Sequence, residues 1–93
     1  MYSIVYAQGA RKALKRLRRG GTFPEAKFRV LLGFLIEGKP LPASFKDHKL
    51  RAELSASREC HLGFDLLVIY RRNETMEIVL IEGVGTHPEL FGE

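Results

Sequence analysis

The sequence has one cysteine, no tryptophan and no long apolar run among its 93 residues. A single cysteine, Cys60, excludes an internal disulfide and is typical of proteins from a reducing compartment. No segment approaches the roughly 20 consecutive apolar residues of a membrane-spanning helix. A short apolar stretch at residues 1–7 precedes the basic residues, which is the reverse of the order in a secretory signal peptide. We therefore expect a cytoplasmic protein that has no membrane partner.

Acidic residues are scarce in the first half of the chain. Residues 1–51 hold 12 Lys or Arg against three acids, whereas residues 52–93 hold three against eight. The formal net charge of +4 therefore conceals a basic half and an acidic half. A block of this kind points to a polyanionic partner, with nucleic acid the first candidate, although a solvated helix face has the same composition. The densest basic run consists of Arg11, Lys12, Lys15, Arg16, Arg18 and Arg19.

The length is too short for a Rossmann domain or a TIM barrel, and it predicts one domain over residues 1–93. Apolar residues recur with helical spacing from Gln8 until Gly20 and Gly21, after a short β-branched and aromatic strand at residues 2–6. A second helix is expected to end near Gly38 and to begin at a capping box formed by Thr22 and Glu25. The short glycine-rich turn predicts that the two helices form an antiparallel hairpin.

The remainder of the chain has the pattern of strands. Candidate strands cover residues 50–54, 58–62, 66–70 and 75–84, with a polar turn at residues 72–74. The order of strand, two helices and then a meander of three or four antiparallel strands is typical of an α+β fold with both helices on one sheet face.

All three histidines fall in the strand-rich half, and we expect none of them on a helix. Histidine exchanges protons near neutral pH, so two histidines on opposite sides of a phosphodiester can act as general base and general acid. A third, protonated histidine can stabilise charge on the phosphorane. The three histidines are His48, His61 and His87. This chemistry is metal-free RNA cleavage through attack by the 2′-OH. Separations of 13 and 26 residues match no local motif, so surface or packing roles are the open alternative.

A zinc site formed by the histidines and Cys60 is a weaker alternative, because the sequence has no Cys-x-x-Cys or His-x-x-x-His pair. Cys60 and His61 are adjacent strand residues and point to opposite faces, so a Cys–His nucleophile is not expected either. We expect no metal and no cofactor.

Four segments form an ordered pattern: FKDHKL at 45–50, RECH at 58–61, DLLVIY at 65–70 and GTHPELFG at 85–92. Together they resemble the YafQ branch of the RelE/ParE toxin superfamily. The resemblance implies an α+β fold like that of small microbial ribonucleases. It also implies a toxin of a type II toxin–antitoxin module, which cleaves mRNA in the ribosomal A site without a metal and is held inactive by a cognate antitoxin.

The resemblance also implies roles for individual residues. His48 is the candidate general base and His87 the candidate general acid, and these two roles can be exchanged. His61 and Asp65 would orient groups or stabilise the transition state, and Glu59 lies where the family often has an acid. Phe91 would contact the RNA near the cleaved bond, and basic residues of the first helix would dock on ribosomal RNA: Lys12, Lys15, Arg16 and Arg19.

The sequence departs from the family pattern at Gly83, where related toxins often carry an arginine that contacts the scissile phosphate. Arg58 and Arg51 are candidate substitutes for that arginine. ParE-like members of the superfamily inhibit DNA gyrase and lack the histidine set, so the three histidines favour the ribonuclease. A gyrase inhibitor and an RNA-binding module without catalysis are the two alternatives.

Overall fold

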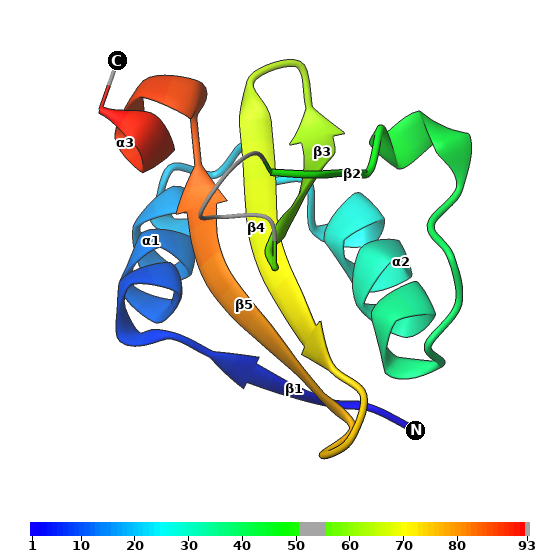
Figure 1. The fold of residues 1–93 in the computed structure, drawn as a ribbon. Coiled ribbons are helices and arrows are strands. Elements are labelled where there is room, and N and C mark those ends of the chain that lie inside the picture. The colour runs from blue at the N-terminus through cyan, green and yellow to red at the C-terminus, as the bar shows by residue number, and fades with distance from the viewer. Residues whose placement is uncertain (51–55, 93) are drawn as a thin grey trace.

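The computed structural model describes residues 1–50 and 56–92 (Figure 1). The elements follow the expected order of one strand, two helices and a meander. In chain order they are β1 (Ser3–Tyr6), α1 (Gln8–Arg19), α2 (Glu25–Ile36), a 3₁₀ turn (Ala43–Phe45), β2 (His48–Lys49), β3 (Arg58–Gly63), β4 (Leu66–Asn73), β5 (Ile78–Gly85) and α3 (His87–Phe91). None of these helices is long and apolar enough to cross a membrane.

The five described strands form one sheet in the order β1-β5-β4-β3-β2. Strands β2 to β5 pair antiparallel with their neighbours, whereas β1 pairs parallel with β5. The parallel pair places the N-terminal strand at the edge opposite the short strand β2. The expected antiparallel meander is therefore confirmed, and β1 extends its sheet by one strand.

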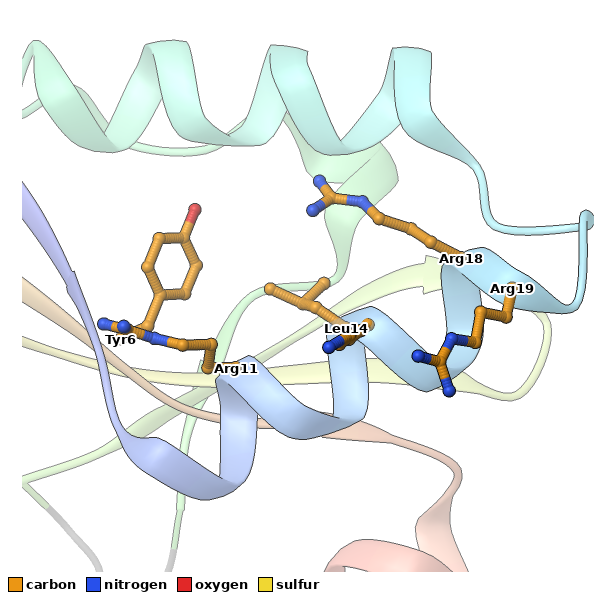
Figure 2. A pocket seen from close by; sticks show the side chains of 6 residues that line it. Tyr6, Arg11, Leu14, Arg18 and Arg19 are labelled. Atoms are coloured by element: carbon orange, nitrogen blue, oxygen red, sulfur yellow. The ribbon is translucent and has the colours of Figure 1, made fainter.

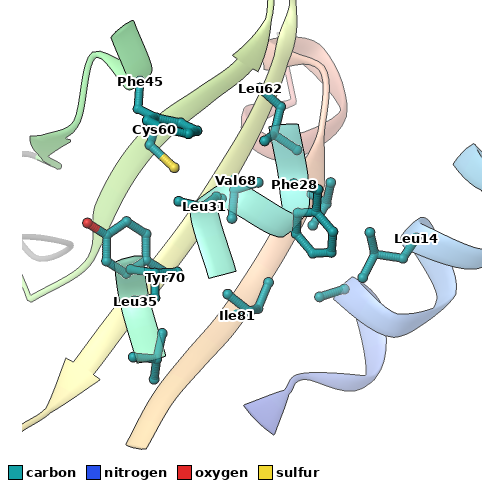
Figure 3. Close-up of a cluster of buried hydrophobic side chains, with 13 residues drawn as sticks. Leu14, Phe28, Leu31, Leu35, Phe45, Cys60, Leu62, Val68, Tyr70 and Ile81 are labelled. Atoms are coloured by element: carbon teal, nitrogen blue, oxygen red, sulfur yellow. The ribbon is translucent and has the colours of Figure 1, made fainter. Parts of the chain in front are cut away.

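Both long helices cover one face of the sheet, as expected (Figure 1). Helix α1 buries Ala10 and Leu14, and helix α2 buries Phe28, Leu31 and Leu35. Figure 3 shows these side chains packed against the strand residues Cys60, Leu62, Val68, Tyr70 and Ile81. Because side chains alternate along a strand, the intervening residues of β3 and β4 point to the other face of the sheet.

The expected capping box at the start of α2 is wrong. The N-cap of α2 is Pro24, which has no side-chain cap, so Thr22 lies two residues before it. The Glu25 carboxylate instead pairs with Arg18, at 2.5 Å from Nε, and this ion pair joins the end of α1 to the start of α2. Proline fixes φ and is favoured at the start of a helix, so Pro24 moves the helix start beyond Thr22.

Two strand boundaries differ from those expected. Strand β4 continues through Asn73, and the turn covers residues 74–77 in place of 72–74. Strand β5 consequently begins at Ile78, with Glu77 before it in a left-handed conformation at φ 53°. Of the candidate strand at residues 50–54, Leu50 is not in a strand and the rest lies outside the described residues.

Helix α3 was not expected, and His87 is its first residue, so the expectation that no histidine lies on a helix is wrong. Thr86 and Glu89 form a capping box: Thr86 Oγ1 accepts from the Glu89 N–H, and Glu89 Oε1 accepts from the Thr86 N–H at 2.8 Å. Pro88 favours the first turn of the helix, and Gly92 ends the helix at φ 74°. The Thr-x-x-Glu spacing was the sequence signal for this helix.

Candidate active site

The second face of the sheet carries the residues expected to do chemistry. Strand pairing aligns His48 with Glu59, Ile69 and Gly83 in one row across four strands. The next row on the same face aligns His61 with Leu67 and Gly85. Neighbouring strands lie about 4.8 Å apart, so His61 and Gly85 are separated by about 10 Å across the sheet. His87 follows Gly85 by two residues, which places all three histidines in or next to two adjacent rows.

His48 and Glu59 form the closest pair in this group. His48 Nε2 lies 2.7 Å from Glu59 Oε2, and the Glu59 side chain is only 10% exposed. The other ring nitrogen, Nδ1, lies 2.9 Å from the Lys46 carbonyl oxygen. The contact with the Lys46 carbonyl suits a proton on Nδ1, which leaves Nε2 and the Glu59 carboxylate to share one exchangeable proton. The His61 ring is next to this pair, with its centroid 6.4 Å from that of His48.

Asp47 anchors the chain immediately before His48. Its Oδ2 accepts from Arg58 Nε at 2.9 Å, and its Oδ1 accepts from the Tyr70 hydroxyl at 2.5 Å. Burial and the bond to Asp47 raise the pKa of Tyr70 above its ordinary value. The hydrogen bond that Arg58 donates to Asp47 raises the pKa of Arg58. This network fixes β2 against β3 and β4. The Tyr70 contribution has no signal in the sequence, because the three residues are far apart in the chain.

Replacing Asp47 by asparagine is expected to lower the free energy of unfolding by about 1–3 kcal/mol, because it weakens two partly buried hydrogen bonds at once, those from Arg58 and from Tyr70. Urea unfolding at pH 7 measures this, below the pH range in which Tyr70 ionises. Asp65→Asn is the matched control, since Asp65 is exposed in the β3–β4 turn, and we expect a change within about 0.5 kcal/mol. Equal stability of the two variants would contradict the anchoring role.

The segment around His87 is held from both sides. The Glu89 carboxylate pairs with Arg16 Nη2 of α1 at 3.0 Å. Its hydrogen bond with the Thr86 backbone lowers the pKa of Glu89, and the charge of Arg16 acts in the same direction. A Cβ at Gly85 would lie 3.0 Å from Glu89 Oε1, so this glycine permits the close approach of α3 to β5. The Phe91 ring centroid lies 4.8 Å from that of His87.

Asp65 lies apart from the His48–Glu59 pair. It is exposed in the β3–β4 turn and lines a cavity of about 370 Å³ with Thr86, the residue before His87. The cavity walls are otherwise mostly apolar, and they come from the turn between α1 and α2 and from β3 and β4. Asp65 therefore lies near Thr86, and among the described residues no hydrogen bond or ion pair joins it to His48.

Cys60 points away from His61 into the core, as its place in the strand predicts. Burial raises the pKa of the Cys60 thiol to about 12. A thiol with such a pKa is protonated at neutral pH and is a poor nucleophile or metal ligand. Within residues 1–50 and 56–92, no three of His, Cys, Asp and Glu lie close enough to ligate one metal ion.

The basic residues of α1 border a groove of about 530 Å³ (Figure 2). Leu14 and Tyr6 form its apolar part, and Lys15 and Arg19 are exposed beside them. Burial raises the pKa of the Tyr6 hydroxyl above its ordinary value. Lys12 and Arg16 are also exposed on this helix, and Arg16 forms an ion pair with Glu89.

The structure describes only one of the two candidate substitutes for the missing arginine, Arg58. The Arg58 guanidinium is bound to Asp47, with Nη2 at 2.7 Å from Oδ2. The alternation along β3 places it on the opposite face from Glu59 and His61. Arg51 lies outside the described residues. Gly83 itself packs against α3, because a Cβ there would meet Leu90 Cδ2 at 2.9 Å.

Comparison with known proteins gives a consistent result. A family model described as the bacterial toxin of a type II toxin–antitoxin system, YafQ, matches residues 2–92. The mRNA interferase toxin YafQ of Escherichia coli K12 is 33% identical over 92 residues, which cover 98% of this chain and 92% of that protein.

Two solved structures show the same fold. The crystal structure of the E. coli DinJ–YafQ complex contains a chain that is 31% identical, with a TM-score of 0.84 over 99% of this chain and 100% of that one. A metal-bound toxin from Helicobacter pylori is 33% identical, with a TM-score of 0.88 over 98% of this chain and 100% of that one.

Proposed function

Because the chain belongs to the YafQ family of bacterial toxins from type II toxin–antitoxin systems, we propose that it is an mRNA interferase that cleaves mRNA on the ribosome. The observation that carries this proposal is the gathering of His48, Glu59 and His61 on the sheet face without helices α1 and α2, beside the start of α3 at His87. This arrangement places candidate proton acceptors and proton donors in and next to two rows of one sheet face.

The reaction is a transesterification. The 2′-oxygen of the RNA attacks the adjacent phosphorus, and the bond from phosphorus to the 5′-oxygen of the next nucleotide breaks. We assign uptake of the 2′-OH proton to the His48–Glu59 pair as one unit, because a contact of 2.7 Å lets either partner hold the proton. His87 gives a proton to the departing 5′-oxygen. The products are a 2′,3′-cyclic phosphate and a 5′-hydroxyl.

Three further residues support this reaction. His61, when protonated, stabilises the negative charge of the phosphorane from a position next to His48. Asp65 orients the His87 end of the site through the cavity that it shares with Thr86. Phe91, whose ring lies against His87, offers a surface on which a base next to the cleaved bond can stack.

Ribosomal RNA is the proposed partner of helix α1. Lys12, Lys15 and Arg19 present positive charge on its exposed side, and Arg16 adds to it while bound to Glu89. Neutralisation of phosphates by such residues gives most of the nonspecific affinity for RNA, and it weakens steeply as salt rises. Arg51 and Arg58 are further candidate contacts for RNA, and Arg58 serves mainly to hold Asp47.

We further propose that residues 1–93 act as one toxin domain in the cytoplasm, where translating ribosomes are found, and that a cognate antitoxin inhibits it. The E. coli relative forms a complex with DinJ. For this chain, the antitoxin is expected to be encoded by a short reading frame beside the toxin gene.

The test is expression of the chain with and without that neighbouring reading frame, combined with purified protein on translating ribosomes. We expect growth arrest that the neighbouring frame relieves, and defined cuts in ribosome-bound mRNA. Intact mRNA together with inhibition of gyrase supercoiling would contradict the proposal and support a ParE-like toxin. Intact mRNA with salt-dependent RNA binding would contradict it in favour of a binding module.

A further inference from the structure

Positive charge near the reacting phosphate accelerates cleavage through a phosphorane, because negative charge accumulates on its oxygens in the transition state. The row that contains His48 and Glu59 ends at Gly83, which has no side chain. Histidines supply this charge only while protonated. An arginine that faces the same side of the sheet supplies it at every physiological pH.

The strand residues that the structure describes place one such arginine on this face, Arg71 of β4. Side chains alternate along β4, so Arg71 shares its face with Ile69, and Ile69 lies between Glu59 and Gly83 in the row of His48. The neighbouring Arg72 points to the opposite face, where its Nη2 donates to the Lys39 carbonyl at 3.0 Å.

A carboxylate holds Arg71 in place over the sheet. Arg71 Nη2 lies 2.7 Å from Glu82 Oε2, and the second Glu82 oxygen accepts from the Ser57 hydroxyl at 2.5 Å. Glu82 is the extra residue at the irregularity between β4 and β5, where Ile69 pairs with Gly83 and Tyr70 pairs with Ile81. Glu82 follows the core residue Ile81, so alternation along β5 places it on the face of Arg71 and Ser57. The three side chains therefore cross the sheet beside the row of His48.

The length and the exposure of the Arg71 side chain permit a contact with RNA. Arg71 is two residues from Ile69 along β4, which is about 7 Å and within the length of an extended arginine side chain. Its side chain is 48% exposed, and the contact with Glu82 uses one of its five N–H donors. The guanidinium can therefore keep its bond to Glu82 while it offers a pair of donors to a phosphate.

We infer that Arg71 binds the reacting phosphate of the RNA and serves as the cationic catalytic residue of this site in place of a side chain at position 83. The inference rests on the proposed RNA cleavage. Glu82 keeps the guanidinium aimed across the row of His48, and the reaction is otherwise as written above, with no additional proton or bond change.

The first experiment is single-turnover cleavage of mRNA on programmed ribosomes by Arg71→Gln. We expect the rate to fall by about 10²–10³-fold, the loss found when one donor to a developing oxyanion is removed. Arg72→Gln is the matched control, since it removes the same charge from the adjacent position on the other face. We expect its cleavage rate to stay within about threefold of the wild type once folding is verified by its melting temperature.

The second experiment adds Gly83→Arg to the Arg71→Gln chain. This substitution returns a guanidinium to the row of His48 from the neighbouring strand, and it requires only the end of the Leu90 side chain to move. We expect at least tenfold recovery of the cleavage rate. A purely structural role of Arg71 would give no recovery.

Binding of adenosine 3′-monophosphate, followed by NMR, separates this inference from the proposed function. We expect Arg71→Gln to weaken binding at least tenfold and Arg72→Gln to leave it unchanged. If the wild type leaves ribosome-bound mRNA intact, the proposed function fails and the nucleotide still tests Arg71. Equal binding by the two variants, or cleavage by Arg71→Gln at the wild-type rate, would overturn the inference.

Discussion

Replacing His48 by alanine is expected to slow mRNA cleavage by about 10²–10⁴-fold, the range found when a general acid or base is removed. The substitution deletes the ring that lies 2.7 Å from Glu59 and leaves that nearly buried carboxylate without its partner. Both members of the proton-accepting pair are therefore impaired by one change. The measurement is the single-turnover rate on programmed ribosomes, with protein in excess over mRNA.

Lys49→Ala provides the control for this experiment. Lys49 is the other residue of β2, is exposed, and points to the opposite face. We expect its cleavage rate to stay within about threefold of that of the wild type, because it loses a charge outside the site. If His48→Ala cleaved as fast as Lys49→Ala, His48 would have no catalytic role.

Replacing Phe28 by alanine is expected to lower the free energy of unfolding by about 3–5 kcal/mol. Phe28 is 1% exposed in the middle of the core between α2, α1 and the sheet (Figure 3). The Phe23 ring packs edge-on against it with centroids 5.4 Å apart, and the Arg18 guanidinium lies 5.7 Å from its centre. A domain of this size has a total stability of about 5–15 kcal/mol, so the variant is expected to be partly unfolded at 37 °C.

Val30 lies on the same helix but is 50% exposed, so Val30→Ala is the matched control. Its stability is expected to change by less than about 0.5 kcal/mol. The measurement is urea unfolding followed by circular dichroism at 222 nm. If both variants unfolded at the same urea concentration, the packing of α2 against the sheet would differ from that described.

The helices were predictable because their apolar spacing and their ends are local features. Gly20 and Gly21 end α1, and the apolar residues of α2 recur at intervals of three and four. The start of α2 was not predicted, since Pro24 and Thr22 both give helix-start signals and the fold uses the proline. The short helix α3 was missed even though Thr86 and Glu89 have capping-box spacing, because the segment has too few residues to show a helical period.

The composition of the site was predictable from the pattern of histidines, but its geometry was not. The contact of His48 with Glu59 depends on the pairing of β2 with β3, and a shift of one residue would put Glu59 on the other face. The network of Asp47, Arg58 and Tyr70 joins residues 11 and 23 positions apart, which no local signal relates. The pair of Arg71 and Glu82 joins residues 11 positions apart and depends on the pairing of β4 with β5.

The unequal distribution of charge also has a structural meaning. The basic α1 presents its charge on the helical side of the molecule, whereas Glu59 and Glu82 lie among the histidines on the other face of the sheet. Two carboxylates of the acidic half hold specific groups there: Glu59 holds His48, and Glu82 holds Arg71. In the proposed function, the basic half provides nonspecific attraction to RNA.

One substrate tests the central claim most directly: an mRNA on programmed ribosomes that has a single 2′-deoxynucleotide at the site of cleavage. Histidine-assisted attack by the 2′-OH predicts that the all-ribose mRNA is cut to a 2′,3′-cyclic phosphate and a 5′-hydroxyl, while the substituted mRNA stays intact at that position. Equal cutting of the two messages would show that water or another nucleophile attacks the phosphate, and it would contradict the mechanism assigned to His48, Glu59 and His87.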